Sequence, residues 1–251
     1  MAGKALKLNQ KIHIARLLDQ IGICRIEAGI PAMGGEEKKS VEKIAALGLK
    51  SKISSWNRLN VRDIEMSMEC GVDLIQLSVP SSDIQIARKL NNTREWVVDH
   101  LRRCIELCNE KGFPAAIGLE DASRAERDFL FRLIDCAVSE GVRVVRYADT
   151  VGILSRSKAY EDICAINAKY ELQLEMHAHN DFGMAVANSI AAAKAGAELI
   201  DCTAGGIGER CGNCNMLDFM KAAGEFIDGC DFELDKVEEV QKQILHIING
   251  S

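Results

Sequence analysis

The sequence predicts an α/β fold, because helix-like and strand-like segments alternate along its 251 residues. Nine segments place apolar residues at the spacing of an amphipathic helix, and seven short segments between them are mostly apolar. Glycine directly follows several of these helices, as expected where a helix ends in a left-handed residue. Strands that are apolar on both sides are typical of a parallel sheet covered by helices.

The first predicted helix covers residues 8–21, where one face is apolar and Gly22 ends the helix. The other helices are expected at 36–47, 60–70, 93–111, 124–140, 156–170, 182–195, 214–227 and 235–248. The strands are expected at 23–28, 50–55, 73–79, 114–119, 142–147, 172–177 and 198–203. This order fits consecutive β/α units.

A TIM (β/α)8-type barrel is the expected assembly, because such a barrel gathers residues from the carboxyl ends of many strands. A doubly wound open sheet is the main alternative, but no G-x-G-x-x-G motif follows the first strand. We expect a single domain over residues 1–251, with the barrel in about 1–230 and a C-terminal helix in 231–251.

The predicted barrel lacks its first strand, because the pattern gives seven strands and the chain opens with a helix. Three explanations stay open. Residues before Met1 are missing, another chain supplies the strand, or the barrel is open at this seam.

The composition is that of a globular cytoplasmic protein, with 47% hydrophobic and 27% charged residues. A net charge of −6 without a long basic tract argues against a nucleic-acid partner and against an anionic membrane surface. No apolar run reaches the length of a membrane span, and no signal peptide is evident. The ten cysteines lie mostly in apolar segments, which indicates reduced thiols, and the CxxC of Cys211 and Cys214 lacks a second pair for zinc.

The segment from Glu175 to Asp181 reads EMHAHND and ends a strand-like run. Alternate side chains of a strand point the same way, so His177 and His179 present two imidazoles on one side of the sheet. Such a pair can bind a divalent metal, because neutral imidazole suits Zn, Fe, Mn and Co. The alternative is that the two histidines are core residues with their hydrogen bonds satisfied there. Asn180 and Asp181 follow at a turn, where either can cap the next helix.

Other polar residues fall where the predicted strands end. They are Glu27, Glu120, Asp121, Arg146, Asp149, Thr150 and the glycine-rich loop 205–213. In a barrel these groups meet at one rim. Each also has a structural interpretation: a carboxylate or threonine can cap a helix or form an ion pair, and the loop can simply require tight turns rather than bind phosphate.

Four motifs resemble the 2-isopropylmalate synthase/homocitrate synthase family of metal-dependent, Claisen-condensing TIM barrels. They begin at Ile26 (IEAGIPAMG), Arg146 (RYADTVG), His177 (HAHNDFGMA) and Gly208 (GERCGN). The match follows nearly the whole chain in order. The first two motifs favour the nitrogen-fixation type of homocitrate synthase.

The resemblance implies a divalent metal (Mg, Mn, Zn, Fe or Co) held by His177 and His179, with Asn213 beside or within its coordination sphere. Two imidazoles make a weak site for a hard cation, so a carboxylate is expected as third ligand. Glu27 is the candidate that this chain itself offers for that place.

The resemblance also implies a condensation of acetyl-CoA with a 2-oxo acid, 2-oxoglutarate in a homocitrate synthase. Glu120 matches the family's glutamate in acid-base catalysis, and Thr150 matches the residue that binds the substrate carboxylate. Glu27, Asp149 and Glu209 are expected to shape the substrate site. Alternatives are isopropylmalate, citramalate or Re-citrate synthase, a lyase running the reverse cleavage, and a non-catalytic subunit.

Three departures from the family pattern bear on activity. The family opens with a strand carrying Asp-x-x-x-Arg-Asp-Gly-Glu-Gln, whereas this chain starts at Met1-Ala2-Gly3, and the family's C-terminal lid with its catalytic His has no counterpart before Ser251. Ala116 stands where lysine-pathway homocitrate synthases carry an Arg. We therefore expect low activity alone, and a homodimer or a hetero-oligomer with a chain that supplies the missing elements.

Overall fold

Seven parallel strands form one curved sheet in the computed structural model, which describes residues 6–250. The strands pair in chain order: β1 (Arg25–Glu27), β2 (Lys52–Arg58), β3 (Leu74–Pro80), β4 (Ala115–Glu120), β5 (Val144–Asp149), β6 (Gln173–Ala178) and β7 (Leu199–Asp201). The opening residues Met1-Ala2-Gly3 and the last residue, Ser251, lie outside the described part.

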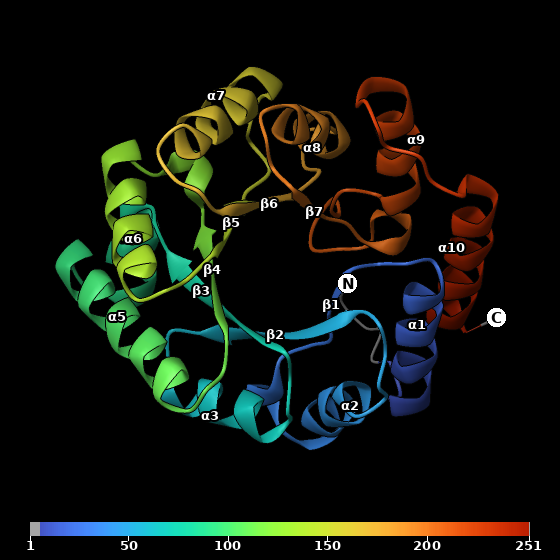
Figure 1. The fold of residues 1–251 in the computed structure, drawn as a ribbon, viewed down its shortest axis with the longest axis horizontal. Helices are drawn as coiled ribbons and strands as arrows, with labels where there is room; N and C mark the ends of the chain where they lie inside the picture. Colours follow the sequence, from blue (N-terminus) through green and yellow to red (C-terminus); the bar gives the residue numbers. More distant parts are fainter. Residues whose placement is uncertain (1–5, 251) are drawn as a thin grey trace.

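Helices surround the sheet on its outside (Figure 1). They are α1 (Leu8–Gln20), α2 (Gly35–Ala45), α3 (Val61–Glu69), α4 (Asp83–Gln85), α5 (Arg94–Glu110), α6 (Arg127–Ser139), α7 (Arg156–Asn167), α8 (Ala185–Lys194), α9 (Met216–Phe226) and α10 (Leu234–Asn249). All nine predicted helices are present. The sequence pattern missed α4, the π-helical turn Ile86–Leu90 that continues it, and the 3-10 turns Pro31–Met33 and Ala204–Gly206, because each is too short for a clear periodicity.

The sheet curls into a barrel that is open between β1 and β7 (Figure 1). Each of these strands has three residues and pairs with one neighbour only, within the part of the chain described. Helices α1 and α10 lie side by side next to this seam and share a small apolar cluster of Leu17, Val240 and Ile244. The expectation of a TIM-type barrel short of one strand is confirmed for residues 6–250.

The main core fills the space between the sheet and its helices. Ile75, Leu77, Ile117 and Leu119 are fully buried there, which accounts for the apolar character of the strands. No helix of residues 6–250 is long and apolar enough to cross a membrane.

The inside of the barrel is polar. Along one line of register partners, Gly118 pairs with Arg146 and Arg146 pairs with Glu175. A side chain at position 118 would have its Cβ 3.0 Å from Gln76 Nε2 and 3.7 Å from Arg146 Cδ. Glycine at 118 therefore leaves room for the buried arginine in the lumen.

Candidate active site

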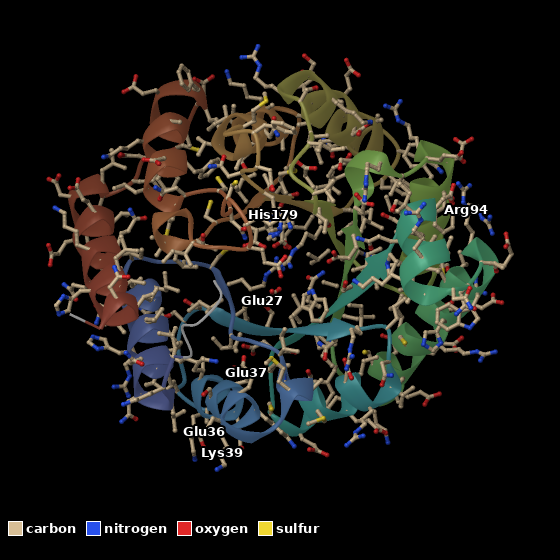
Figure 2. The ribbon with its side chains drawn as sticks, turned by 180° about the vertical axis from the view of Figure 1, so that it is seen from behind. Glu27, Glu36, Glu37, Lys39, Arg94 and His179 are labelled. Carbon is tan, nitrogen blue, oxygen red and sulfur yellow. The ribbon has the colours of Figure 1, made fainter. Side chains whose placement is uncertain are left out.

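His177 and His179 stand at the end of β6 with their Nε2 atoms 3.2 Å apart. Their ring planes differ by 72°, so the rings meet edge to face rather than stack. The two Nε2 atoms therefore face the same place. Figure 2 shows that both His179 and Glu27 of β1 lie near the middle of the ring of strands. The predicted pairing of two imidazoles on one side of the sheet is therefore present.

The other ring nitrogen of His177 contacts a carboxylate that the sequence pattern did not single out. His177 Nδ1 lies 2.8 Å from Asp201 Oδ2. These residues are register partners on β6 and β7, so backbone pairing brings their side chains together. The usable signal was position: Asp201 is the last residue of the strand beside the histidines.

A buried ion network lies next to the histidines. Arg146 Nη2 is 2.8 Å from Glu27 Oε2 and 3.5 Å from Asp201 Oδ2, and Arg146 Nε donates to Glu175 Oε1 at 3.0 Å. Glu175 also accepts from Arg25. Two guanidinium groups thus face three carboxylates, which leaves one negative charge in excess beside the imidazoles.

The two histidines differ in their affinity for protons. Burial opposes a positive charge on His177, but the carboxylates of Asp201 and Glu27 outweigh the effect of burial. The pKa of His177 is therefore raised. Burial, together with the proximity of His177 and Arg210, lowers the pKa of His179 to about 4. Burial also opposes the charge on Asp201, yet Arg146 and His177 hold the pKa of this carboxyl well below its usual range.

Asn213 is held beside His179 by backbone pairing. The two residues form an antiparallel bridge, and Asn213 N–H donates to the Gly206 carbonyl at 3.0 Å. The side-chain oxygen of Asn213 is buried and has no hydrogen-bond partner in the described chain. A Cβ at position 208 would lie 2.1 Å from that oxygen, so Gly208 makes its position possible.

The loop that carries Asn213 is fastened to the rest of the rim. Arg210 donates to both carboxylate oxygens of Asp181, at 2.8 and 3.0 Å, and to the Thr150 carbonyl at 2.7 Å. Asp181 is thereby an ion-pair partner, whereas Asn180 Oδ1 accepts from the N–H of Ala185 at the start of α8. The N-cap of α8 is Met184, so neither predicted residue is the cap, although Asn180 accepts from the first backbone N–H of the helix.

Glu120 and Thr150 meet at the ends of β4 and β5. The Thr150 hydroxyl donates to Glu120 Oε2 at 3.2 Å and accepts from the Asp121 N–H at 2.8 Å. Asp121, in turn, is buried and paired with Arg124. A fixed backbone donor thus orients the hydroxyl, and the hydroxyl orients the predicted acid-base residue.

The remaining predicted site residues have different surroundings. Asp149 is fully buried, and its oxygens accept from the N–H groups of Ile153 and Leu154, so it supports the loop after β5. Glu209 is exposed and lies 3.6 Å from Arg210. Glu27 bonds to Arg146, and no third His, Cys, Asp or Glu completes a metal cluster within residues 6–250. In this structure Arg146 bonds the Glu27 carboxylate, so the role of Glu27 as a third metal ligand stays a prediction.

The donor set fits a divalent cation at the two imidazoles. Nitrogens bound to one cation at about 2.1 Å lie roughly 3.0–3.4 Å apart for angles between octahedral and tetrahedral, and the observed separation is 3.2 Å. The orphaned oxygen of Asn213 and the excess negative charge of the ion network favour a cation at the same place.

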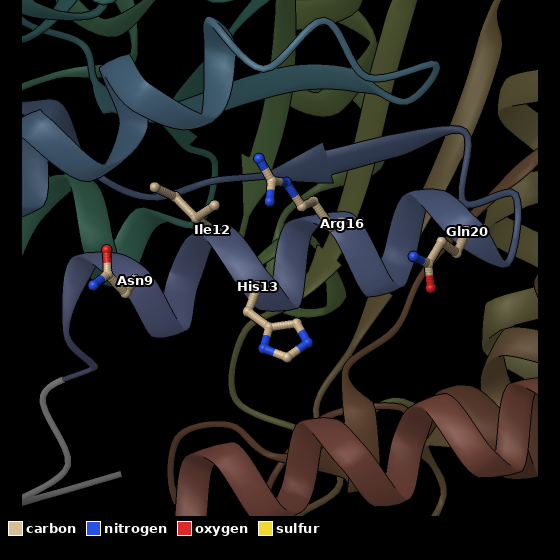
Figure 3. A pocket seen from close by; sticks show the side chains of 5 residues that line it. All are labelled: Asn9, Ile12, His13, Arg16 and Gln20. Atoms are coloured by element: carbon tan, nitrogen blue, oxygen red, sulfur yellow. The ribbon is translucent and has the colours of Figure 1, made fainter.

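A separate pocket of about 410 Å³ lies along α1 (Figure 3). Its lining residues are Asn9, Ile12, His13, Arg16 and Gln20. None of the predicted site residues is among them, and His13 is an exposed residue of α1.

Fold and rim define a parallel α/β barrel protein with a paired-imidazole site at the carboxyl ends of its strands. The chain belongs to the HMGL-like family, whose model matches residues 1–242. It is 49% identical over 247 residues to homocitrate synthase subunit alpha of Clostridium pasteurianum, covering 96% of this chain and 92% of that protein. The resemblance to the isopropylmalate and homocitrate synthases is thus confirmed.

Other relatives are longer than this chain. It is 45% identical over 221 residues to 2-isopropylmalate synthase 2 of Caldanaerobacter subterraneus subsp. tengcongensis, covering 88% of this chain and 58% of that protein. The chain therefore spans less than two thirds of that relative. Among solved structures, the hydroxymethylglutaryl-CoA lyase of Pseudomonas aeruginosa superposes with a TM-score of 0.84 at 16% identity, covering 99% of this chain and 88% of the other, which supports the barrel fold.

Proposed function

We propose that the chain is the barrel part of an acyltransferase that condenses acetyl-CoA with a 2-oxo acid in the cytoplasm. The observation that carries this proposal is the convergence of His177 and His179 Nε2 atoms, 3.2 Å apart, at the same rim as Glu120 and Thr150. The similarity to homocitrate and isopropylmalate synthases supports the reaction class. Homocitrate from 2-oxoglutarate is the product we favour.

A divalent cation bound by His177, His179 and Asn213 would act as a Lewis acid on the oxygens of the 2-oxo acid. Thr150 places a hydroxyl where it can donate to the substrate carboxylate once it turns from Glu120. Glu120 then takes or returns a proton as the acetyl methyl group becomes a carbon nucleophile. Water hydrolyses the thioester, so the products are a 2-hydroxy acid and free CoA.

Glu27 and Asp149 support this site at one remove. Glu27 anchors Arg146 in the lumen, and Asp149 fixes the loop after β5 through Ile153 and Leu154. We propose that both shape the substrate cavity without touching the reacting atoms.

A second substrate is favoured by one observation in the lumen. Ala116 pairs in register with Gln76, whose amide is buried and has no hydrogen-bond partner within the described residues. An uncharged amide and a methyl group are poorer partners for a second carboxylate than an arginine. Isopropylmalate or citramalate synthesis from 2-oxoisovalerate or pyruvate is therefore the alternative to homocitrate synthesis.

The open seam supports a partner. Within residues 6–250, strands β1 and β7 present unpaired edges that a further parallel strand fits, and such edges readily accept another chain. We propose a hetero-oligomer in which a second polypeptide supplies that strand; a homodimer is the other arrangement.

The test is CoA release from acetyl-CoA with 2-oxoglutarate, 2-oxoisovalerate, pyruvate and oxaloacetate, measured for the chain alone and with a polypeptide carrying the missing strand and lid. We expect metal-dependent turnover with one 2-oxo acid in the mixture and little with the chain alone. Glu120→Gln should lower kcat about 10²- to 10⁴-fold. No turnover with any of the four acids in the complete, metal-loaded mixture would contradict the proposal.

A further inference from the structure

Asp201 connects the histidine pair to the ion network inside the barrel. Its Oδ2 atom lies 2.8 Å from His177 Nδ1 and 3.5 Å from Arg146 Nη2. The side chains of His177 and Asp201 are about four fifths buried, with exposed fractions of 19% and 22%. The contact therefore has little competition from water.

We propose that Asp201 is a positioning residue that fixes the tautomer of His177. A neutral imidazole carries one proton, and an ionised carboxylate can only accept a hydrogen bond. The proton of His177 then lies on Nδ1, facing Asp201, and the Nε2 lone pair faces the place shared with His179. The inference rests on the proposed function, because a metal ligand needs an unprotonated Nε2.

Arg146 explains why Asp201 acts through His177 rather than as a ligand itself. The guanidinium lies on the same oxygen that accepts from His177, and it also bonds to Glu27 and Glu175. The same Asp201 oxygen is thus placed between Arg146 Nη2 and His177 Nδ1. Asp201 is thus held as an acceptor, and the register of β6 with β7 keeps it opposite His177.

The tautomer can be read in the metal-free chain by long-range ¹H–¹⁵N correlation of ¹⁵N-histidine-labelled protein at alkaline pH, where the imidazole is neutral, with His177→Gln assigning the signal. We expect Nδ1–H at His177 in the wild type and a mixture of both tautomers in Asp201→Ala. A wild-type His177 protonated on Nε2 would overturn the inference. The wild-type spectrum alone decides the inference, and it needs no bound metal. A variant is needed only to assign the His177 signal.

Cobalt(II) binding, followed by its visible absorption, supplies the second readout. Asp201→Ala should weaken Co²⁺ binding about 10- to 100-fold, and Asp201→Asn should lose less because its amide oxygen still accepts from Nδ1. Binding by Asp201→Ala within about twofold of the wild type, or an equal loss in Asp201→Asn with an altered band intensity that marks a lost ligand, would overturn the inference.

Asp162→Asn is the matched control. Asp162 is a buried carboxylate that accepts from Tyr147 and Arg127 between β5, α6 and α7, outside the barrel lumen. Its substitution should lower stability and leave the Co²⁺ affinity unchanged. If the wild type took up no Co²⁺, the proposed function would fail, and the His177 tautomer would still decide the role of Asp201.

Discussion

Two imidazole nitrogens 3.2 Å apart set the chemistry of the rim, and their neighbours make them unequal. His177 faces the Asp201 carboxylate, whereas the Nδ1 atom of His179 is buried and has no hydrogen-bond partner within residues 6–250. One ring is therefore oriented by a charge and the other by packing. This difference has consequences for the stability of the metal-free chain in acid.

Acid should destabilise the metal-free chain through His179. The pKa of His179 is about 4 in the folded chain, against an ordinary value of 6.5, so the unfolded chain binds the proton more readily. The contribution of neutral His179 to the free energy of unfolding is therefore retained above pH 6.5 and is lost as the pH falls toward 4. At pH 5 the loss amounts to about 2 kcal/mol, which His179→Gln should remove.

Urea unfolding at pH 7 and pH 5 measures this difference, with the exposed His13→Gln as control. As the pH falls from 7 to 5, the unfolding free energy of the wild type should decrease more than that of His179→Gln. That of His13→Gln should decrease as much as the wild type's. Equal pH dependence of all three proteins would refute the buried, neutral state of His179.

The loop 206–213 shows how an element positions a side chain. Gly212 has φ of 96°, and a Cβ there would lie 2.2 Å from the Gly206 carbonyl oxygen. That carbonyl accepts from Asn213 N–H, and the Gly212 carbonyl accepts from Asn180 N–H at 2.8 Å. The glycine thus joins the two rim segments that carry His179 and Asn213.

Gly212→Ala should displace this loop. We expect a loss of about 3 kcal/mol or more in unfolding free energy together with weakened Co²⁺ binding, because both the backbone strain and the clash fall on the rim. Gly229→Ala is the control: φ is 79° there, but nothing lies within 4 Å of a Cβ. It should cost only about 1–2 kcal/mol and leave metal binding intact. Similar Co²⁺ affinities for both variants would contradict the role of the loop.

The elements were largely predictable from apolar periodicity, but their contacts were not. The strand predicted at 172–177, which the structure has at Gln173–Ala178, and the pair His177–His179 follow from sequence spacing alone. Arg146 and Glu27 are 119 residues apart and meet only because the sheet curls, and Asp201 meets His177 only in the register of β6 with β7. A one-residue change in either register would point these side chains away, and a single sequence does not specify register across helices.

At the scale of the whole molecule, the seam is the weakest part of the sheet. Within residues 6–250, strands β1 and β7 each have one neighbour, whereas β4 pairs with β3 along its length and with β5 from Ile117 to Leu119. Arg146 on β5 reaches Glu27 on β1 and Asp201 on β7, so side chains rather than a backbone ladder link the two edges. This arrangement leaves the backbone groups of the edges available for a further strand.

Hydrogen exchange should report this difference. Amides of β1 and β7 are expected to exchange faster than those of β3, β4 and β5 in the isolated chain, because a strand held on one side opens locally at lower cost. A polypeptide that completes the barrel should slow exchange at β1 and β7 and leave β4 nearly unchanged. Protection of β1 and β7 equal to that of β4 in the isolated chain would show that the seam is already closed.

The most direct measurement for the central claim is the visible spectrum of the Co²⁺-loaded chain during titration with 2-oxoglutarate, 2-oxoisovalerate and pyruvate. We predict about one tightly bound Co²⁺ per chain, a spectrum that changes when the preferred 2-oxo acid is added, and loss of both in His177→Ala/His179→Ala. The same Co²⁺ stoichiometry in that double variant, or a wild-type spectrum unaffected by all three acids, would contradict the account.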